Sequence, residues 1–144
     1  MKDDRGQALV VAVLALGIAA ATIVGLSGAQ DRILADARER RAGEAAVEAA
    51  GAAVADAQVV FLASLRDEAG QRRAIPSRAE LDGFVSDPLV VERARAAADE
   101  LAVANGSGSV SDFSIQTRTR TIEVAVALGA HRQRASIESR CCRP

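Results

Sequence analysis

The apolar positions of this chain follow two contrasting patterns, an uninterrupted run near the start and periodic stripes in the rest. Residues 6–30, GQALVVAVLALGIAAATIVGLSGAQ, contain no charged side chain and follow the charged residues 2–5. About 20 apolar residues let a helix cross the hydrocarbon core of a bilayer. The first interpretation of residues 1–30 is therefore a short polar tail and a retained transmembrane anchor.

A cleaved secretory signal peptide is a second interpretation of the same run. The small residues 27–29 stand before Gln30 and fit the usual cleavage rule. The run is longer than the usual apolar region of about 7–15 residues, however, and residues 3 and 4 are acidic where such peptides are basic. A third interpretation is a prepilin-type leader that is cut between Gly6 and Gln7.

Small residues recur along the apolar run at spacings of four and three, which places them near one face of a helix. Such residues let a neighbouring transmembrane helix approach closely. The alternative is that they only reflect the alanine-rich composition of the run. The residues that would line such a helix–helix contact are Gly17, Ala21, Gly25 and Gly28.

Basic residues on both sides of the run leave its orientation open. Lys2 and Arg5 precede it, and arginines at positions 32, 38, 40 and 41 follow it. The larger count after the run favours a cytoplasmic C-terminal side by the positive-inside rule. Long domains translocate largely regardless of such charges, so this count does not fix the topology.

Residues 31–68 are rich in alanine, arginine and glutamate, contain no proline, and are predicted to continue as a helix. Gly43 and Gly51 weaken this helix by about 1 kcal/mol each relative to alanine. Apolar residues recur at spacings of three and four and form a stripe that we expect to pack in the core of a domain. The stripe consists of Val47, Ala50, Val54, Ala57, Phe61 and Leu65.

Two start signals predict two further helices after a polar connection over residues 69–76. Ser77-Arg78-Ala79-Glu80 has the pattern of a capping box and should open a short helix that runs to about Phe84. Asp87-Pro88 combines a capping residue with proline at the first helical position, and Asn105-Gly106 should end the helix that follows. The expected buried face of this helix consists of Val90, Ala94, Ala97, Leu101 and Ala104.

Alternating apolar and polar residues predict strands in the last part of the chain. Residues 113–117 and, more clearly, 122–128 alternate and should pair as a hairpin that turns near Arg118-Thr119. Gly129-Ala130-His131 should turn into a weaker third strand around Ala135 and Ile137. The expected fold class is α+β, with an anchor over residues 1–30, a helix over 31–70 and a small α/β module over 71–144 that ends in a three-stranded meander.

Composition and motifs indicate no catalytic or cofactor chemistry. Aromatic residues make up 2% of the chain, and the net charge of -1 argues against a nucleic-acid surface, which needs a basic patch. His131, in a turn that we expect to be exposed, has no partner at metal-ligand spacing. We expect no enzyme activity, cofactor, metal or small-molecule substrate. Five acidic residues are expected to be solvating charges rather than an acid/base pair: Asp56, Asp67, Glu68, Glu80 and Asp82.

The two cysteines are adjacent, at Cys141 and Cys142. Adjacent cysteines bridge each other only with strain, so they define no disulfide framework. In an oxidising compartment they could form an intermolecular bridge, and the alternative is a terminal tail without a role.

The order of segments resembles the TadE/TadG-like proteins of Tad (Flp-type) pilus assembly systems. The similarity begins with the opening Arg5-Gly6-Gln7-Ala8-Leu9-Val10 before an apolar helix and continues in the alanine-rich helix with Ala45-Ala46 and Ala49-Ala50. It extends to the helix that ends at Ala104-Asn105-Gly106. The last similar segments are the runs Ile122-Glu123-Val124-Ala125-Val126 and Arg134-Ala135-Ser136.

This resemblance implies a non-enzymatic, single-pass protein of the cytoplasmic membrane with its N-terminus inside and a pilin-like, extracytoplasmic C-terminal domain. Such proteins are minor pilins or accessory components of a fibre-building or secretion apparatus, and their partners are the membrane and other pilin-like subunits. Processed members carry glutamate five residues after the cleaved glycine, whereas this chain has Val11 there. The departure fits the unprocessed, TadG-like branch better.

Two alternatives to a pilus component stay open at this point. One is an exported periplasmic or secreted binding module that starts at Gln30 after signal-peptide cleavage. The other is a membrane-tethered sensor or scaffold whose helix over residues 31–68 forms a coiled coil, although its short, alanine-rich stripe is a poor seam.

Overall fold

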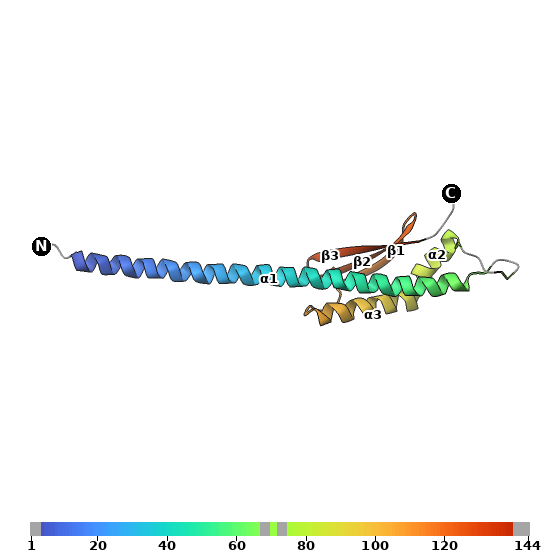
Figure 1. Cartoon of the computed structure of the whole chain (residues 1–144), viewed down its shortest axis with the longest axis horizontal. Coiled ribbons are helices and arrows are strands. Elements are labelled where there is room, and N and C mark those ends of the chain that lie inside the picture. Colours follow the sequence, from blue (N-terminus) through green and yellow to red (C-terminus); the bar gives the residue numbers. More distant parts are fainter. Residues whose placement is uncertain (1–3, 67–69, 72–74, 140–144) are drawn as a thin grey trace. The chain divides into compact units, whose positions relative to one another are not determined.

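The computed structural model describes residues 4–66, 70–71 and 75–139, with side chains from residue 10 onward. Three helices, α1 (Asp4–Ser64), α2 (Arg78–Val85) and α3 (Pro88–Ala104), precede three strands, β1 (Asp112–Thr117), β2 (Thr121–Leu128) and β3 (His131–Glu138) (Figure 1). The fold is α+β, as the sequence predicts.

The chain divides into two compact units, Met1–Ala37 and Arg38–Pro144, which we call unit 1 and unit 2. This division differs from the three expected segments, because α1 from Arg38 onward belongs with α2, α3 and the sheet. The reason is that Ala42, Ala46 and Val47 already lie in the core of unit 2. Helix α1 is continuous through Gly25 and Gly28, where its sequence has no proline to interrupt it.

The starts of α2 and α3 carry the caps that the sequence predicts. At α2 the Ser77 hydroxyl accepts from the Glu80 backbone N–H, and the Ser77 backbone N–H donates to Glu80 Oε2 at 2.7 Å. At α3 Asp87 Oδ1 accepts from the Leu89 backbone N–H at 2.9 Å, and Pro88 follows the cap. These bonds satisfy N–H groups that have no partner inside the helix.

The buried face of α3 differs from the expected one. Ala94, Ala98 and Ala102 are fully buried, whereas Leu101 and Ala104 are exposed. Ala42, Ala46 and Ala50 of α1 belong to the same buried cluster. Because alanine faces let helices approach closely, the core takes the alanines and leaves the larger Leu101 and Val103 to solvent.

The strands form one antiparallel sheet in the order β1-β2-β3. Arg118 N–H donates to the Thr121 carbonyl at 2.7 Å, so the first hairpin turns at Thr119-Arg120, one residue later than expected. Leu128 pairs with His131, and Gly129 in the second turn has a positive φ of 52°. The face of the sheet that lies toward the core carries Ile122, Val124, Val126 and Leu128, which are all buried.

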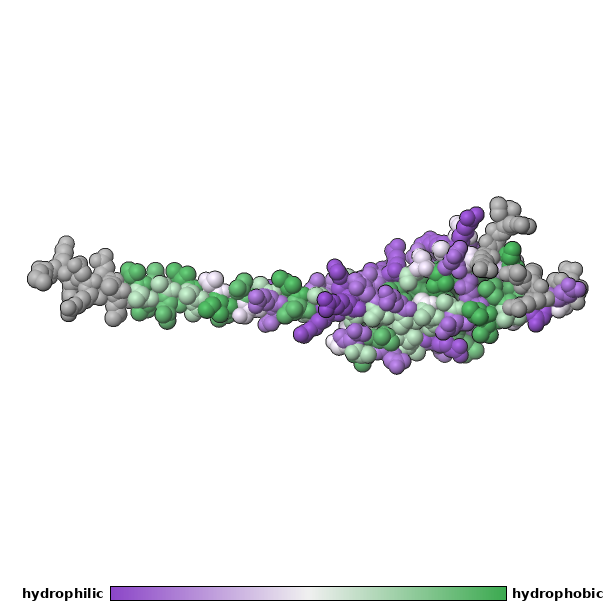
Figure 2. Space-filling view, viewed as in Figure 1, coloured by the Kyte–Doolittle hydropathy of each residue, from purple (hydrophilic) through white to green (hydrophobic). Residues whose placement is uncertain are grey.

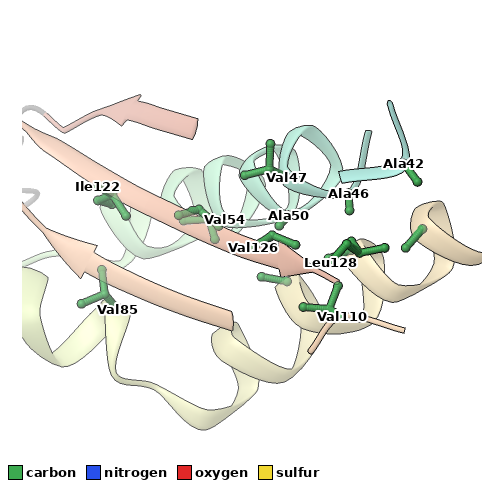
Figure 3. Packing of buried hydrophobic residues seen from close by; sticks show 14 of the residues in the cluster. Ala42, Ala46, Val47, Ala50, Val54, Val85, Val110, Ile122, Val126 and Leu128 are labelled. Atoms are coloured by element: carbon green, nitrogen blue, oxygen red, sulfur yellow. The ribbon is translucent and has the colours of Figure 1, made fainter. Parts of the chain in front are cut away.

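Helix α1 packs against the edge strand β3 through glycine. A Cβ added at Gly43 would lie 3.2 Å from Gln133 Cγ, and one added at Gly51 would lie 3.6 Å from Ala135 Cβ. Both glycines that weaken the helix therefore lie against β3 with little or no room to spare beyond a Cβ. Figure 3 shows Val47, Val54 and Ala50 of α1 in the core with Val126 and Leu128 of β2.

A polar cluster ties α2 to the β1–β2 hairpin. The guanidinium of Arg78 donates to the Arg118 carbonyl at 2.9 Å, to the Thr117 carbonyl at 3.1 Å and to Thr117 Oγ1 at 2.8 Å. Thr117 Oγ1 in turn donates to Asp82. The hydrogen bond from Thr117, followed by the bond and charge of Arg78, holds the pKa of Asp82 below its ordinary value. Asp82 thus has a structural role rather than the solvating role that the sequence suggests.

The close approach at Gly51 predicts a size limit at this position. Gly51→Leu should lower the free energy of unfolding by about 1–3 kcal/mol, because an overpacked contact must move helix or strand. Gly51→Ala is the matched control and should be neutral or stabilising by up to about 1 kcal/mol, since its Cβ only reaches ordinary contact distance. Urea unfolding of the full chain in detergent, followed by circular dichroism, measures both. Equal free energies of unfolding for Gly51→Leu and Gly51→Ala would contradict the packing of α1 on β3.

The lowered pKa of Asp82 predicts an acid-dependent contribution to stability. A carboxylate with a depressed pKa in the folded state stabilises the fold above its unfolded pKa of about 3.9 and loses this contribution as the pH falls through the folded pKa. Asp82→Asn should therefore lower the melting temperature at pH 7 and make less difference below about pH 4. Asp56→Asn, at an exposed position of α1, is the control and should change the melting temperature little at either pH. If the difference in melting temperature between Asp82→Asn and the parent does not depend on pH, the lowered pKa of Asp82 is wrong.

Candidate functional site

The exposed apolar surface of α1 in unit 1 is the main candidate for a functional surface. Its large apolar side chains over residues 10–26 are 60–76% exposed: Val10, Val11, Val13, Leu14, Leu16, Ile18, Ile23, Val24 and Leu26. The helix is long and apolar enough to cross a membrane, and its most apolar stretch has no part buried inside the structure. Figure 2 shows apolar surface along this part of α1. Exposed apolar surface of this extent marks a contact with a membrane or a protein partner.

The few polar side chains of this stretch are satisfied within the helix. Thr22 Oγ1 donates to the Ile18 carbonyl at 2.8 Å, and Ser27 Oγ donates to the Ile23 carbonyl at 2.9 Å. Polar groups need internal partners in hydrocarbon, where water is absent. The two hydroxyls therefore fit a lipid environment as well as an aqueous one.

One face of the stretch carries a shallow apolar depression at Gly17. Val10, Val13, Leu14, Ile18 and Ala21 surround this glycine at the spacings of one helix face. A single helix encloses no cavity, so the depression is a notch in a surface. A Cβ added at Gly17, Gly25 or Gly28 would meet nothing within 4 Å. No contact in the described part of the chain thus requires glycine at these positions.

The residues of the predicted core stripe lie inside unit 2. Val47, Val54 and Leu65 are buried, and Phe61 is half-buried and stacks on Phe84 with ring centroids 4.8 Å apart. The possible cleavage position at Gly6 and Gln7 falls in the first turns of α1, where the side chains are outside the described part. Cys141 and Cys142 also lie outside the described residues.

The face of the sheet away from the core carries paired charges. Arg132 reaches across the small Ala127 of β2 to Asp112 at 2.9 Å, and Glu123 lies 3.4 Å from Arg118 and 3.8 Å from Arg134. The arginines on this face are balanced by carboxylates. Among the residues that the structure describes, these ion pairs offset the positive charge of this face.

Within residues 4–66, 70–71 and 75–139, no three histidine, cysteine or acidic side chains converge as metal ligands would. His131 is half-buried as the first residue of β3, not exposed in a turn as expected, because its register with Leu128 turns it toward the core-facing side of the sheet.

An apolar groove in unit 2 is a feature that sequence reasoning missed. Its lining comes from α1, from the end of α2 and from the start of α3: Ala57, Val60, Phe61, Phe84, Asp87, Leu89, Val90 and Arg93. The sequence signal was the continuous run Val59-Val60-Phe61-Leu62, because one face of a helix cannot bury four consecutive residues. Val59 and Val60 are accordingly 68% and 70% exposed.

Comparisons of this chain with protein-family models, with curated proteins and with solved structures found no match.

Proposed function

We propose that this protein is a non-enzymatic, membrane-anchored minor pilin or accessory component of a Tad or type IV-like pilus or secretion apparatus. The observation that carries the proposal is the exposed apolar stretch of α1, which leads without a break into the helix that forms the core of unit 2. An apolar N-terminal helix followed by a small α+β domain is the organisation that the TadE/TadG-like resemblance implies.

The proposed topology is a single pass through the cytoplasmic membrane, with the N-terminus inside and unit 2 outside. Subunits of the same class would be the partners, and they would associate through the notch at Gly17 and the row of small residues Ala21, Gly25 and Gly28. Support comes from the open space around these glycines. Each glycine costs the helix about 1 kcal/mol relative to alanine, and no described contact within the chain offsets this cost.

An exported binding module released after Ala29 is the second candidate function. One observation favours it, because the buried core of unit 2 begins at Ala42 and would survive this cleavage intact. A coiled-coil scaffold is not proposed, since Val47 and Val54, which would form its seam, are buried inside unit 2.

The anchor is tested by a charge at the middle of the apolar stretch. Ala15→Asp should reduce the carbonate-resistant membrane fraction of the protein, because an acidic residue near the bilayer centre costs about 2.5–3.5 kcal/mol on insertion scales. Ala52→Asp, at an exposed position of the same helix in unit 2, is the matched control and should leave the membrane fraction unchanged. Equal membrane retention of the two variants would refute the anchor.

The two candidate functions predict different mature proteins. The intact mass of the native protein from membranes and from sheared surface fractions should correspond to a start near Met1, or to a start at Gln7 if a prepilin peptidase acts despite Val11. Either result, together with copurification of pilin-like subunits, supports the pilus component. A soluble protein that starts at Gln30 would overturn it in favour of the exported module.

A further inference from the structure

The groove in unit 2 has an apolar floor and two exposed apolar lips. Phe61 and Phe84 stack at its base, while Val60 and Leu89 at its sides are 70% and 73% exposed. Its volume is about 310 Å³, near the lower end of the range for small-molecule pockets. A groove of this size holds a few side chains rather than a whole helix.

Among the described lining residues, the polar side chains are one acid and one base. Asp87 Oδ1 accepts from the Leu89 backbone N–H at 2.9 Å, and a carboxylate has further acceptor positions. The Arg93 side chain forms no hydrogen bond or ion pair with any residue that the structure describes. A partner with charges of one sign would match only one of these two groups.

A surface that carries one positive and one negative side chain can pair with the same surface of a second copy. When two copies pack about a two-fold axis, each residue pair occurs twice, because the same patch serves on both sides. Asp87 of each copy can then meet Arg93 of the other, and the exposed Leu89 and Val60 of each copy can enter the opposite groove. A small molecule would need several convergent polar groups to be oriented there, and the groove has only these two.

We propose that two copies of this chain pack against each other through the groove at the start of α3, with reciprocal Asp87–Arg93 ion pairs and Leu89 near the two-fold axis. The contact is formed by unit 2 alone. It does not depend on the membrane anchor or on a role in a pilus, so the two proposals can fail separately.

Cysteine cross-linking of the full chain in native membranes tests this contact. In a background with Cys141→Ser and Cys142→Ser, the variant Leu89→Cys should give a disulfide-linked homodimer under mild oxidation. Val103→Cys is the matched control, because Val103 is 59% exposed on the same helix but lies outside the groove. Equal cross-linking of both variants, none for Leu89→Cys, or a product with the mass of a different protein would each overturn the proposal.

The ion pairs are tested by charge reversal combined with Leu89→Cys. Arg93→Glu places two carboxylates together at each end of the contact and should weaken the dimer about tenfold, which corresponds to about 1.4 kcal/mol. Arg95→Glu has the same change in net charge on an exposed position of α3 outside the groove, and should preserve the cross-linked fraction. Circular dichroism shows whether both variants keep the fold. Equal effects of the two reversals would overturn the reciprocal pairing.

Discussion

The close contact between α1 and β3 is the interaction on which unit 2 depends. A Cβ at position 43 would lie 3.2 Å from Gln133 Cγ and one at position 51 would lie 3.6 Å from Ala135 Cβ, so side chains larger than alanine would hold the helix away from β3. With the helix seated this closely, Val47 and Val54 reach the apolar side of β2 (Figure 3). The loss in helix propensity at each glycine is about 1 kcal/mol, similar to what burial of one or two methylene groups returns. Two positions that weaken an isolated helix therefore lie against β3 in the folded unit.

Small side chains also explain how a chain with few aromatic residues builds a core. Alanines at every fourth position of α1 and α3 share one buried cluster, in which short side chains bring the backbones together. The larger side chains that do not fit this layer stay outside it. Val60 and Leu89 are examples, and they become the lips of the groove.

Helix α1 combines two kinds of surface in one secondary structure. In unit 1 its apolar side chains point in all directions and its hydroxyls bond to their own helix, which suits a surrounding of hydrocarbon. In unit 2 one face of the helix is buried, which suits a helix that lies on a sheet in water. A helix with these two halves meets the physical requirements of the membrane-anchored subunit that we propose.

The sequence by itself determined the elements and their chemistry at short range. The uncharged run, the caps at Ser77 and Asp87 and the alternation over residues 122–128 are local patterns, and local sterics and hydrogen bonds are sufficient to specify them. The candidate membrane segment could be predicted for the same reason. Only the tertiary structure decided which face of α3 is buried, that Gly43 and Gly51 lie against β3, and that Asp82 bonds to Thr117 across the fold. These features depend on distances between segments far apart in the chain, and burial follows from the fit of two surfaces rather than from the periodicity of one.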